Sequence, residues 1–259
     1  MGPETSDDPS LTTLRAQLLA ELERLRHEQS SPEEFLRAAG EALHGLPLYP
    51  PAVIRAIGAA LADDLDRSPA LAVDLTLRLI SSPEREVRAL AATILSRLAR
   101  FQPGMWVDPA RHLVCDEDWE VRDLAARVFD LQDDGEGAAG FHLEFVCDVL
   151  RQWAEHADER VRRAATHALL GFAAANPPFR PRLLQMLAPL LNDPQEYVRH
   201  SLAAALRVLG RADPELIFGF IESRVDPLTD GAREVFRLVL DHPFAARHPG
   251  RKAALLARL

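Results

Sequence analysis

The stretch CDEDWEVRDLAARVF, residues 115–129, places a tryptophan and a carboxylate at a helical spacing. Trp119 and Asp123 are four residues apart, so on a helix their side chains lie on one face. An indole attracts cations through its quadrupole, and a carboxylate stabilises positive charge that develops in a transition state. The pair therefore suits a flat, positively charged substrate. The structural alternative is an indole packed between helices and an Asp123 carboxylate paired with Arg127 on the helix surface.

Other signatures of enzymes and of metal sites are missing from the sequence. It contains no phosphate-binding glycine loop, no dinucleotide fingerprint and no nucleophile elbow. The nine histidines are scattered, and the one His-Glu dipeptide is His27-Glu28, so we expect no metal and no cofactor. Two cysteines, Cys115 and Cys147, are too few for a disulfide framework or a four-cysteine zinc site, which fits a cytoplasmic protein.

The elements that must position these residues follow from a repeat. Six segments share a β-branched residue at the start of an alanine-rich, amphipathic helix. The β-branched anchors are Ile54, Val87, Val121, Val161, Val198 and Val235. Their separations of 33, 34, 40, 37 and 37 residues suit pairs of antiparallel helices stacked into a solenoid. No convincing strand pattern appears, so we predict an all-α fold.

An aspartate followed six positions later by an arginine recurs in these segments, as in Asp116/Arg122 and Asp193/Arg199. This pattern resembles HEAT repeats, in which such residues form a polar ladder between repeats. The resemblance implies a right-handed α-solenoid of about six HEAT-like helical hairpins. It also implies a structural role for the arginines that follow the valine anchors. These are Arg88, Arg122, Arg162 and Arg199.

The sequence predicts a single HEAT-like repeat domain over residues 11–259, behind a disordered tail at residues 1–10. The tail is acidic and polar, unlike a signal peptide. Two additional helices, roughly 11–29 and 32–44, precede the repeats, and a glycine-rich loop at 133–140 separates two of them. No apolar run approaches the roughly 18 residues of a membrane span, so we expect no membrane partner.

The charge gives a mixed indication about nucleic acid. The formal net charge of −9 argues against a strongly basic nucleic-acid-binding protein. Residues 171–259, however, hold 12 basic and 9 acidic side chains, so the last third of the chain is net basic. A phosphate-facing surface in this third is compatible with the charge but not required by it.

Four stretches of the repeats resemble one family. They are LISSPEREVRALAATILSRLARF (79–101), the Trp119-x-x-x-Asp123 segment, a tryptophan ten residues before an arginine (Trp153 and Arg163), and LNDPQEYVRHSLAAALRVLGRADPELIFGFI (191–221). Each is similar to a repeat of the AlkD- and AlkC-type DNA glycosylases of the DNA alkylation repair family. The resemblance covers roughly residues 50–225.

The resemblance implies binding of double-stranded DNA and excision of N3- or N7-alkylated purines. Such a base is cationic, and its glycosidic bond breaks with positive charge developing on the sugar. Asp123 would then be the catalytic carboxylate and Trp119 the aromatic face beside it. Arg163 would hold a backbone phosphate through its planar donors. Trp153 and Tyr197 are further candidates for DNA binding.

One position departs from the family pattern, because Ala204 stands where the AlkD branch has a second active-site tryptophan. Tyr197, Trp153 and Trp106 are the aromatic residues that could replace it, although Trp106 is expected on a connection between helices. Ala204 and the net charge favour a second hypothesis, a non-catalytic HEAT-repeat scaffold that binds DNA or a protein partner.

A further alternative concerns the arginines at 160, 162 and 163. They form a short basic cluster in the sequence, but Asp158 and Glu159 precede them. A solvated face of mixed charge is therefore as compatible with this segment as a basic patch that binds phosphate.

Overall fold

The computed structural model of the chain describes residues 9–48, 51–99, 103–128, 140–175 and 177–259. Over these ranges the regular structure is entirely helical and contains no β-strand, which confirms the predicted all-α fold. Most of the predicted N-terminal tail and of the glycine-rich loop falls outside the described residues. The described helices form two compact units, residues 1–128 and 129–259.

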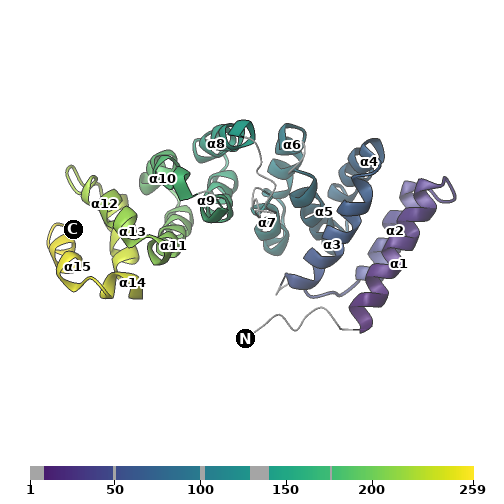
Figure 1. Cartoon of the computed structure of the whole chain (residues 1–259), viewed down its shortest axis with the longest axis horizontal. Coiled ribbons are helices and arrows are strands. Elements are labelled where there is room, and N and C mark those ends of the chain that lie inside the picture. Colours follow the sequence, from purple (N-terminus) through teal and green to yellow (C-terminus); the bar gives the residue numbers. More distant parts are fainter. Residues whose placement is uncertain (1–8, 49–50, 100–102, 129–139, 176) are drawn as a thin grey trace. The chain divides into compact units, whose positions relative to one another are not determined.

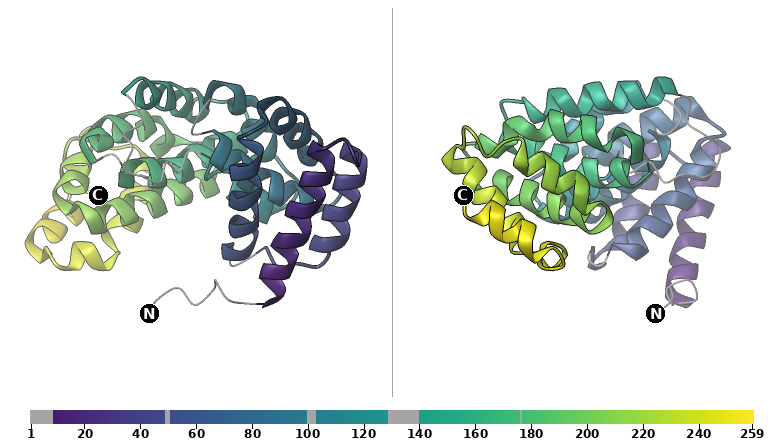
Figure 2. Two further views of the ribbon diagram at one scale, coloured as in Figure 1. Left: turned by 45° about the vertical axis from the view of Figure 1, so that its right-hand side comes forward. Right: turned by 60° about the vertical axis from the view of Figure 1, so that its left-hand side comes forward.

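The first unit is built from helices α1 to α7. Helices α3, α5 and α7 pack in one row, with α4 and α6 against them in a second row (Figures 1 and 2). Helices α1 and α2 match the two additional helices predicted before the repeats. The bounds are α1 (Pro9–Arg26), α2 (Pro32–Leu43), α3 (Ala52–Leu65), α4 (Pro69–Ile80), α5 (Arg85–Leu98), α6 (Pro103–Leu113) and α7 (Trp119–Ala125).

The second unit repeats the arrangement, with α9, α11 and α13 packed in one row and α8, α10 and α12 against that row. Two 3₁₀ helices, η1 and η2, flank α10. The bounds are α8 (Gly140–Ala154), α9 (Glu159–Ala175), η1 (Pro177–Phe179), α10 (Arg180–Leu187), η2 (Ala188–Asn192), α11 (Glu196–Ala212), α12 (Pro214–Glu222), α13 (Asp230–Leu240), α14 (Pro243–Ala246) and α15 (Pro249–Leu256).

All six β-branched anchors lie in the cores of these units. Each is at most 1% exposed, in the helices α3, α5, α7, α9, α11 and α13. Burying a Val or Ile side chain contributes about 1.5–3 kcal/mol, so the anchors are a main source of packing energy. The repeat period therefore located the second helix of each hairpin, whereas the handedness and the number of repeats stay predictions.

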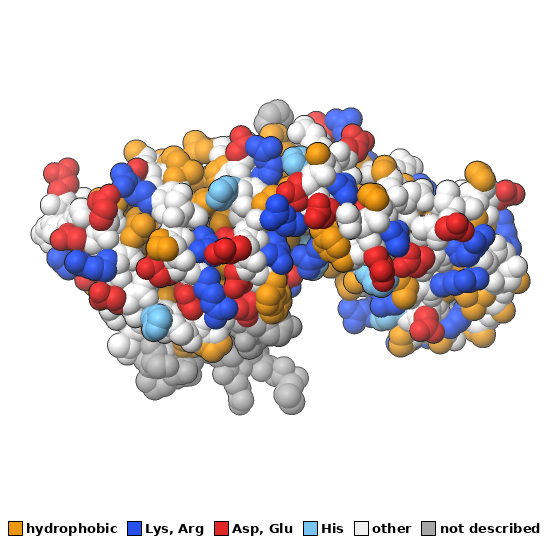
Figure 3. Space-filling model, turned by 180° about the vertical axis from the view of Figure 1, so that it is seen from behind, with side chains coloured by type: hydrophobic (Ala, Val, Ile, Leu, Met, Phe, Trp, Pro, Cys, Tyr) orange, Lys and Arg blue, Asp and Glu red, His pale blue; other side chains and the backbone are white. Residues whose placement is uncertain are grey.

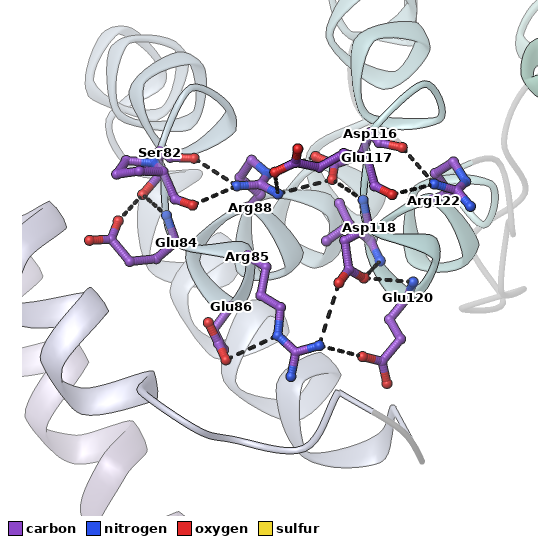
Figure 4. Close-up of polar contacts among 12 residues, drawn as sticks. Ser82, Glu84, Arg85, Glu86, Arg88, Asp116, Glu117, Asp118, Glu120 and Arg122 are labelled. Atoms are coloured by element: carbon purple, nitrogen blue, oxygen red, sulfur yellow. Dashed lines mark hydrogen bonds and ion pairs between the residues drawn. The ribbon is translucent and has the colours of Figure 1, made fainter.

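The predicted polar ladder is present in the first unit (Figure 4). Arg88 of α5 donates from Nε and Nη2 to the two carboxylate oxygens of Asp116, at 2.7 and 3.0 Å. Its Nη1 donates to the carbonyl oxygens of Ser82 and Pro83, at 3.0 and 2.8 Å. The hydrogen bonds from Asp116 raise the pKa of Arg88, so the guanidinium stays charged in its nearly buried position.

The second unit has the same ladder. Arg162 of α9 donates to both carboxylate oxygens of Asp193, at 2.6 and 3.0 Å, which raises the pKa of Arg162. Arg199 of α11 donates to the carbonyl oxygens of Asp193 and Pro194, at 2.7 and 3.4 Å, and to Glu234 of α13 at 2.7 Å. The structural role predicted for these arginines is confirmed.

Two expectations concern elements away from the ladder. Trp106 lies within α6 and is buried, so its expected position on a connection between helices is wrong. The helix α6 contains Pro109 and continues past it to Leu113. Among the described residues, no helix has both the length and the apolar character that a bilayer span needs.

Candidate functional site

The first turn of α7 fixes the place of Trp119, its first residue. Asp118 precedes the helix with an extended backbone and caps it. Its Oδ1 accepts hydrogen bonds from the backbone N–H groups of Glu120 and Val121, at 2.8 and 3.3 Å. Asp116 in turn accepts from the backbone N–H of Asp118 at 2.8 Å. The ladder aspartate therefore holds the residue that caps the helix.

Two arginines hold the same turn from the outside (Figure 4). Arg122 donates from Nη1 to the carbonyl oxygens of Asp116 and Glu117, at 2.7 and 2.8 Å. Arg85 of α5 donates to Glu120 at 3.0 Å, which joins α7 to the neighbouring helix. The start of α7 is thus rigidly defined by side chains that are not themselves candidates for chemistry.

Trp119 is exposed at this fixed turn. The residue is 57% exposed, more than any other large hydrophobic residue in the described part of the chain. An indole that packs between helices would be mostly covered, so the structural alternative for Trp119 is contradicted. An exposed aromatic face on a rigid turn is available for contact with a ligand.

Asp123 lies one helical turn after Trp119 and is half-buried, with 20% of its side chain exposed. Its Oδ2 is 3.6 Å from Nη2 of Arg127, so the predicted surface pair is present. At this length the contact is an ion pair without hydrogen-bond geometry, and such i,i+4 pairs contribute only about 0.3–0.5 kcal/mol. The pair with Arg127 is too weak to fix the carboxylate by itself.

The candidates of the second unit are Arg163 on α9 and Tyr197 on α11. Tyr197 is 39% exposed and Arg163 is half-buried. Partial burial and the carboxylates of Glu159 and Asp158 raise the pKa of Tyr197. The positive charge of Arg163 acts to lower the pKa of Tyr197. The two side chains therefore lie within electrostatic range of each other, on neighbouring helices of one row.

The profile of a family described as DNA alkylation repair enzyme matches residues 40–234, well over half of the chain. The chain belongs to this family. Membership supports a function in DNA repair and implies DNA as a binding partner. None of the curated proteins matches the sequence significantly.

Two solved structures from Streptococcus mutans share the fold. AlkD2 is 18% identical, with a TM-score of 0.67, and the match covers 82% of this chain and 98% of AlkD2. The protein smu.31 from strain UA159 is 19% identical, with a TM-score of 0.54, covering 73% of this chain and 98% of its own. At these identities the likeness shows a shared helical-repeat fold.

The two tryptophans named as further aromatic candidates, Trp153 and Trp106, are buried. Trp153 of α8 is 2% exposed, so its indole packs in the core and the structure does not offer it to DNA. Trp106 is buried as well, which leaves Tyr197 as the exposed ring among the three candidates to replace the second tryptophan. Ala204 itself is exposed on α11, two turns after Tyr197.

The short basic cluster is not a patch of unpaired cations. Arg160 bonds to the carboxylate of Asp158 at 2.8 and 3.1 Å, and Arg162 is the ladder residue bound to Asp193. Acidic and basic side chains of the described residues are interspersed over the face seen in Figure 3. Because Asp158 and Asp193 pair with two of the three arginines, a mixed-charge face is the better description of this segment.

The repeats have equivalent positions on either side of their ladder arginines. Trp119 stands three residues before Arg122, and Asp123 one residue after it. In the same positions of the later repeats, Arg163 follows Arg162, and Glu196 and His200 flank Arg199. The positions of Asp123, Arg163 and His200 are thus equivalent. The equivalence of these positions can be read from the Asp–Arg spacing of the ladder, a pattern that predicts the structural roles of the arginines.

Proposed function

We propose that the protein is a DNA glycosylase that excises N3- or N7-alkylated purines from duplex DNA. The observation that carries the proposal is the exposed indole of Trp119, held on the capped first turn of α7 with Asp123 one turn behind it. Family membership implies that the protein binds DNA, and Trp119 and Asp123 are groups suited to a cationic base and sugar.

In the proposed reaction the glycosidic bond between C1′ and N9 of the alkylated purine breaks, and its electron pair leaves with the cationic base, which becomes neutral. Positive charge moves onto the sugar, where the Asp123 carboxylate stabilises it. Water then attacks C1′, and Asp123 orients this water and accepts its proton. Trp119 contributes about 0.5–2 kcal/mol by placing its π face against the cationic base or sugar.

Arg163 and Tyr197 are proposed to hold the DNA. Arg163 presents a planar donor group suited to a phosphate, and Tyr197 places an exposed ring and hydroxyl within electrostatic range of that arginine. Replacing Arg163 by Ala should weaken DNA binding and lower the slope of log affinity against log salt by about one.

The test of the proposal is base release from a duplex that carries a single N7-methylguanine. Asp123→Asn keeps the shape of the side chain but removes its charge, so release should be lost while DNA affinity is retained. Asp74→Asn is the matched control, because Asp74 also forms an i,i+4 pair with an arginine, Arg78, on α4. Full release by Asp123→Asn would remove this residue from the mechanism.

The second candidate function is a scaffold without catalytic activity that binds DNA or a protein. Ala204 in place of an aromatic residue, the ion pair between Asp123 and Arg127, and the net charge of −9 favour it. Binding of the duplex without base release would support DNA binding by such a scaffold. If the protein neither binds the duplex nor releases the base, the result would indicate a protein partner instead of DNA.

A further inference from the structure

We propose that Glu196, His200 and Glu234 form a binding site for a divalent transition-metal ion, with zinc as the best fit. Glu196 and His200 are four residues apart on α11, and Glu234 comes from the neighbouring helix α13. One ligand atom from each, an imidazole nitrogen or a carboxylate oxygen, lies within 4.8 Å of the other two. The proposal is independent of the glycosylase reaction.

The distances suit a common central ion. Nε2 of His200 is 3.1 Å from Oε1 of Glu234 and 3.6 Å from Oε1 of Glu196. Two ligand atoms bound tetrahedrally to zinc at 2.0–2.1 Å are about 3.3 Å apart, between these two values. Small rotations of exposed side chains would therefore bring all three atoms onto one ion.

The ladder holds one of the ligands in place. Arg199 donates from Nε and Nη2 to Oε2 of Glu234, both at 2.7 Å. With Oε2 held in this way, Oε1 is turned toward His200. An outer group that orients a metal ligand is a usual feature of protein metal sites. Because Arg199 is itself fixed by the carbonyl oxygens of Asp193 and Pro194, the position of Glu234 relative to α11 is defined before any ion binds.

The chemistry of the three groups selects the ion. One imidazole and two carboxylates are ligand types that zinc accepts, and three protein ligands is the number with which zinc keeps a fourth position for water or another ligand. Calcium and magnesium prefer sets made of oxygen alone, so the histidine disfavours them. Two carboxylates also balance the double positive charge, and the exposed side chains of Glu196 and His200 leave the site open to ions from solution.

The sequence alone predicts no metal site, because its one His-Glu dipeptide, His27-Glu28, lies outside the repeats. The proposed ligands are instead brought together by the repeat, since His200 and Glu234 are 34 residues apart, about one repeat length. Such a site is visible only once α11 and α13 are packed against each other.

Equilibrium dialysis of the full chain against zinc sulphate tests the proposal. We expect the wild type to retain one equivalent of zinc that His200→Ala and Glu234→Gln do not retain. His112→Ala is the control, because His112 is also an exposed histidine, on α6, and its loss should change nothing. Zinc should raise the melting temperature of the wild type and of His112→Ala, and leave the other two variants unchanged.

Two results would overturn the proposal. Either the wild type retains no zinc at micromolar free ion, or His200→Ala retains as much as the wild type. In the first case His200 serves only as a hydrogen-bond partner of Glu234, with Glu196 close by at 3.6 Å. If circular dichroism shows that either site variant is unfolded, Glu196→Gln replaces it, since Glu196 is an exposed residue that can be changed without disturbing the core.

Discussion

Helices α7 and α11 begin with the same turn and carry different chemistry. In each, an aspartate six residues before an arginine accepts a backbone N–H two residues on, at 2.8 Å for Asp116 and 2.9 Å for Asp193. The arginine closes the turn by donating to the carbonyl oxygen of that aspartate, at 2.7 Å from both Arg122 and Arg199. The frame of the turn is therefore the same in both helices.

The side chains that flank the arginine differ completely. On α7 they are Trp119 and Asp123, and on α11 they are Glu196 and His200. The ladder fixes the register of each helix, so substitutions at the flanking positions change the chemistry without changing the fold. The repeat thus offers equivalent positions to the proposed catalytic pair in one helix and to the proposed metal ligands in another.

The largest loss of folding stability is expected from breaking the ladder of aspartates and arginines. Asp193→Ala removes both oxygens that Arg162 binds and leaves that guanidinium nearly buried without its carboxylate. Loss of one partner of a buried ion pair costs about 3–5 kcal/mol, and we expect about 3 kcal/mol here because Arg162 keeps the carbonyl oxygens of His156 and Ala157. Urea denaturation measures the change.

His156 gives a matched control for this prediction, because it occupies the ladder position of the aspartates in its own repeat. Its Nδ1 accepts a hydrogen bond from the backbone N–H of Asp158 at 3.0 Å. His156→Ala should therefore lower the free energy of unfolding by only about 1 kcal/mol, the contribution of one ordinary hydrogen bond. Equal losses in the two variants would show that the carboxylate adds nothing beyond its bond to the turn.

Most of the residues that build this shared turn could be predicted from the sequence. The anchors such as Val121 and Val198 and the Asp–Arg spacing follow directly from the repeat, since each residue acts within its own repeat or on the next. Exposure was harder to predict. A tryptophan is compatible with core or surface, and only the packing of the helices buries Trp153 while leaving Trp119 exposed. The Glu–His–Glu cluster also depends on packing, because Glu234 comes from another helix.

A smaller effect should follow from giving α11 the aromatic face that it lacks. Ala204 is exposed, so Ala204→Trp should be accommodated without strain in the core. If this face of α11 meets DNA, the indole should raise affinity for a duplex with an N7-methylguanine by about 1 kcal/mol, or several-fold. Fluorescence anisotropy measures the affinity.

Val208→Trp is the control for that substitution, because Val208 is exposed on α11 one turn beyond Ala204. A gain confined to Ala204→Trp would assign the DNA contact to the start and middle of α11. An equal gain in both variants would indicate only that an exposed indole attracts DNA, and no gain in either would remove this face of α11 from the proposed interface.

The smallest effect concerns the ion pair between Asp123 and Arg127 on α7, which would oppose the catalytic role proposed for Asp123. Arg127→Ala removes the cation 3.6 Å from Asp123 and should cost at most about 0.5 kcal/mol of folding free energy. Base release should be equal to or modestly faster than in the wild type, since a positive charge beside the carboxylate opposes its action on a cationic sugar. Arg151→Ala, which breaks the exposed pair with Asp148, is the control. A loss of release as large as that expected of Asp123→Asn would instead make Arg127 a positioning residue, which holds the carboxylate in its working orientation.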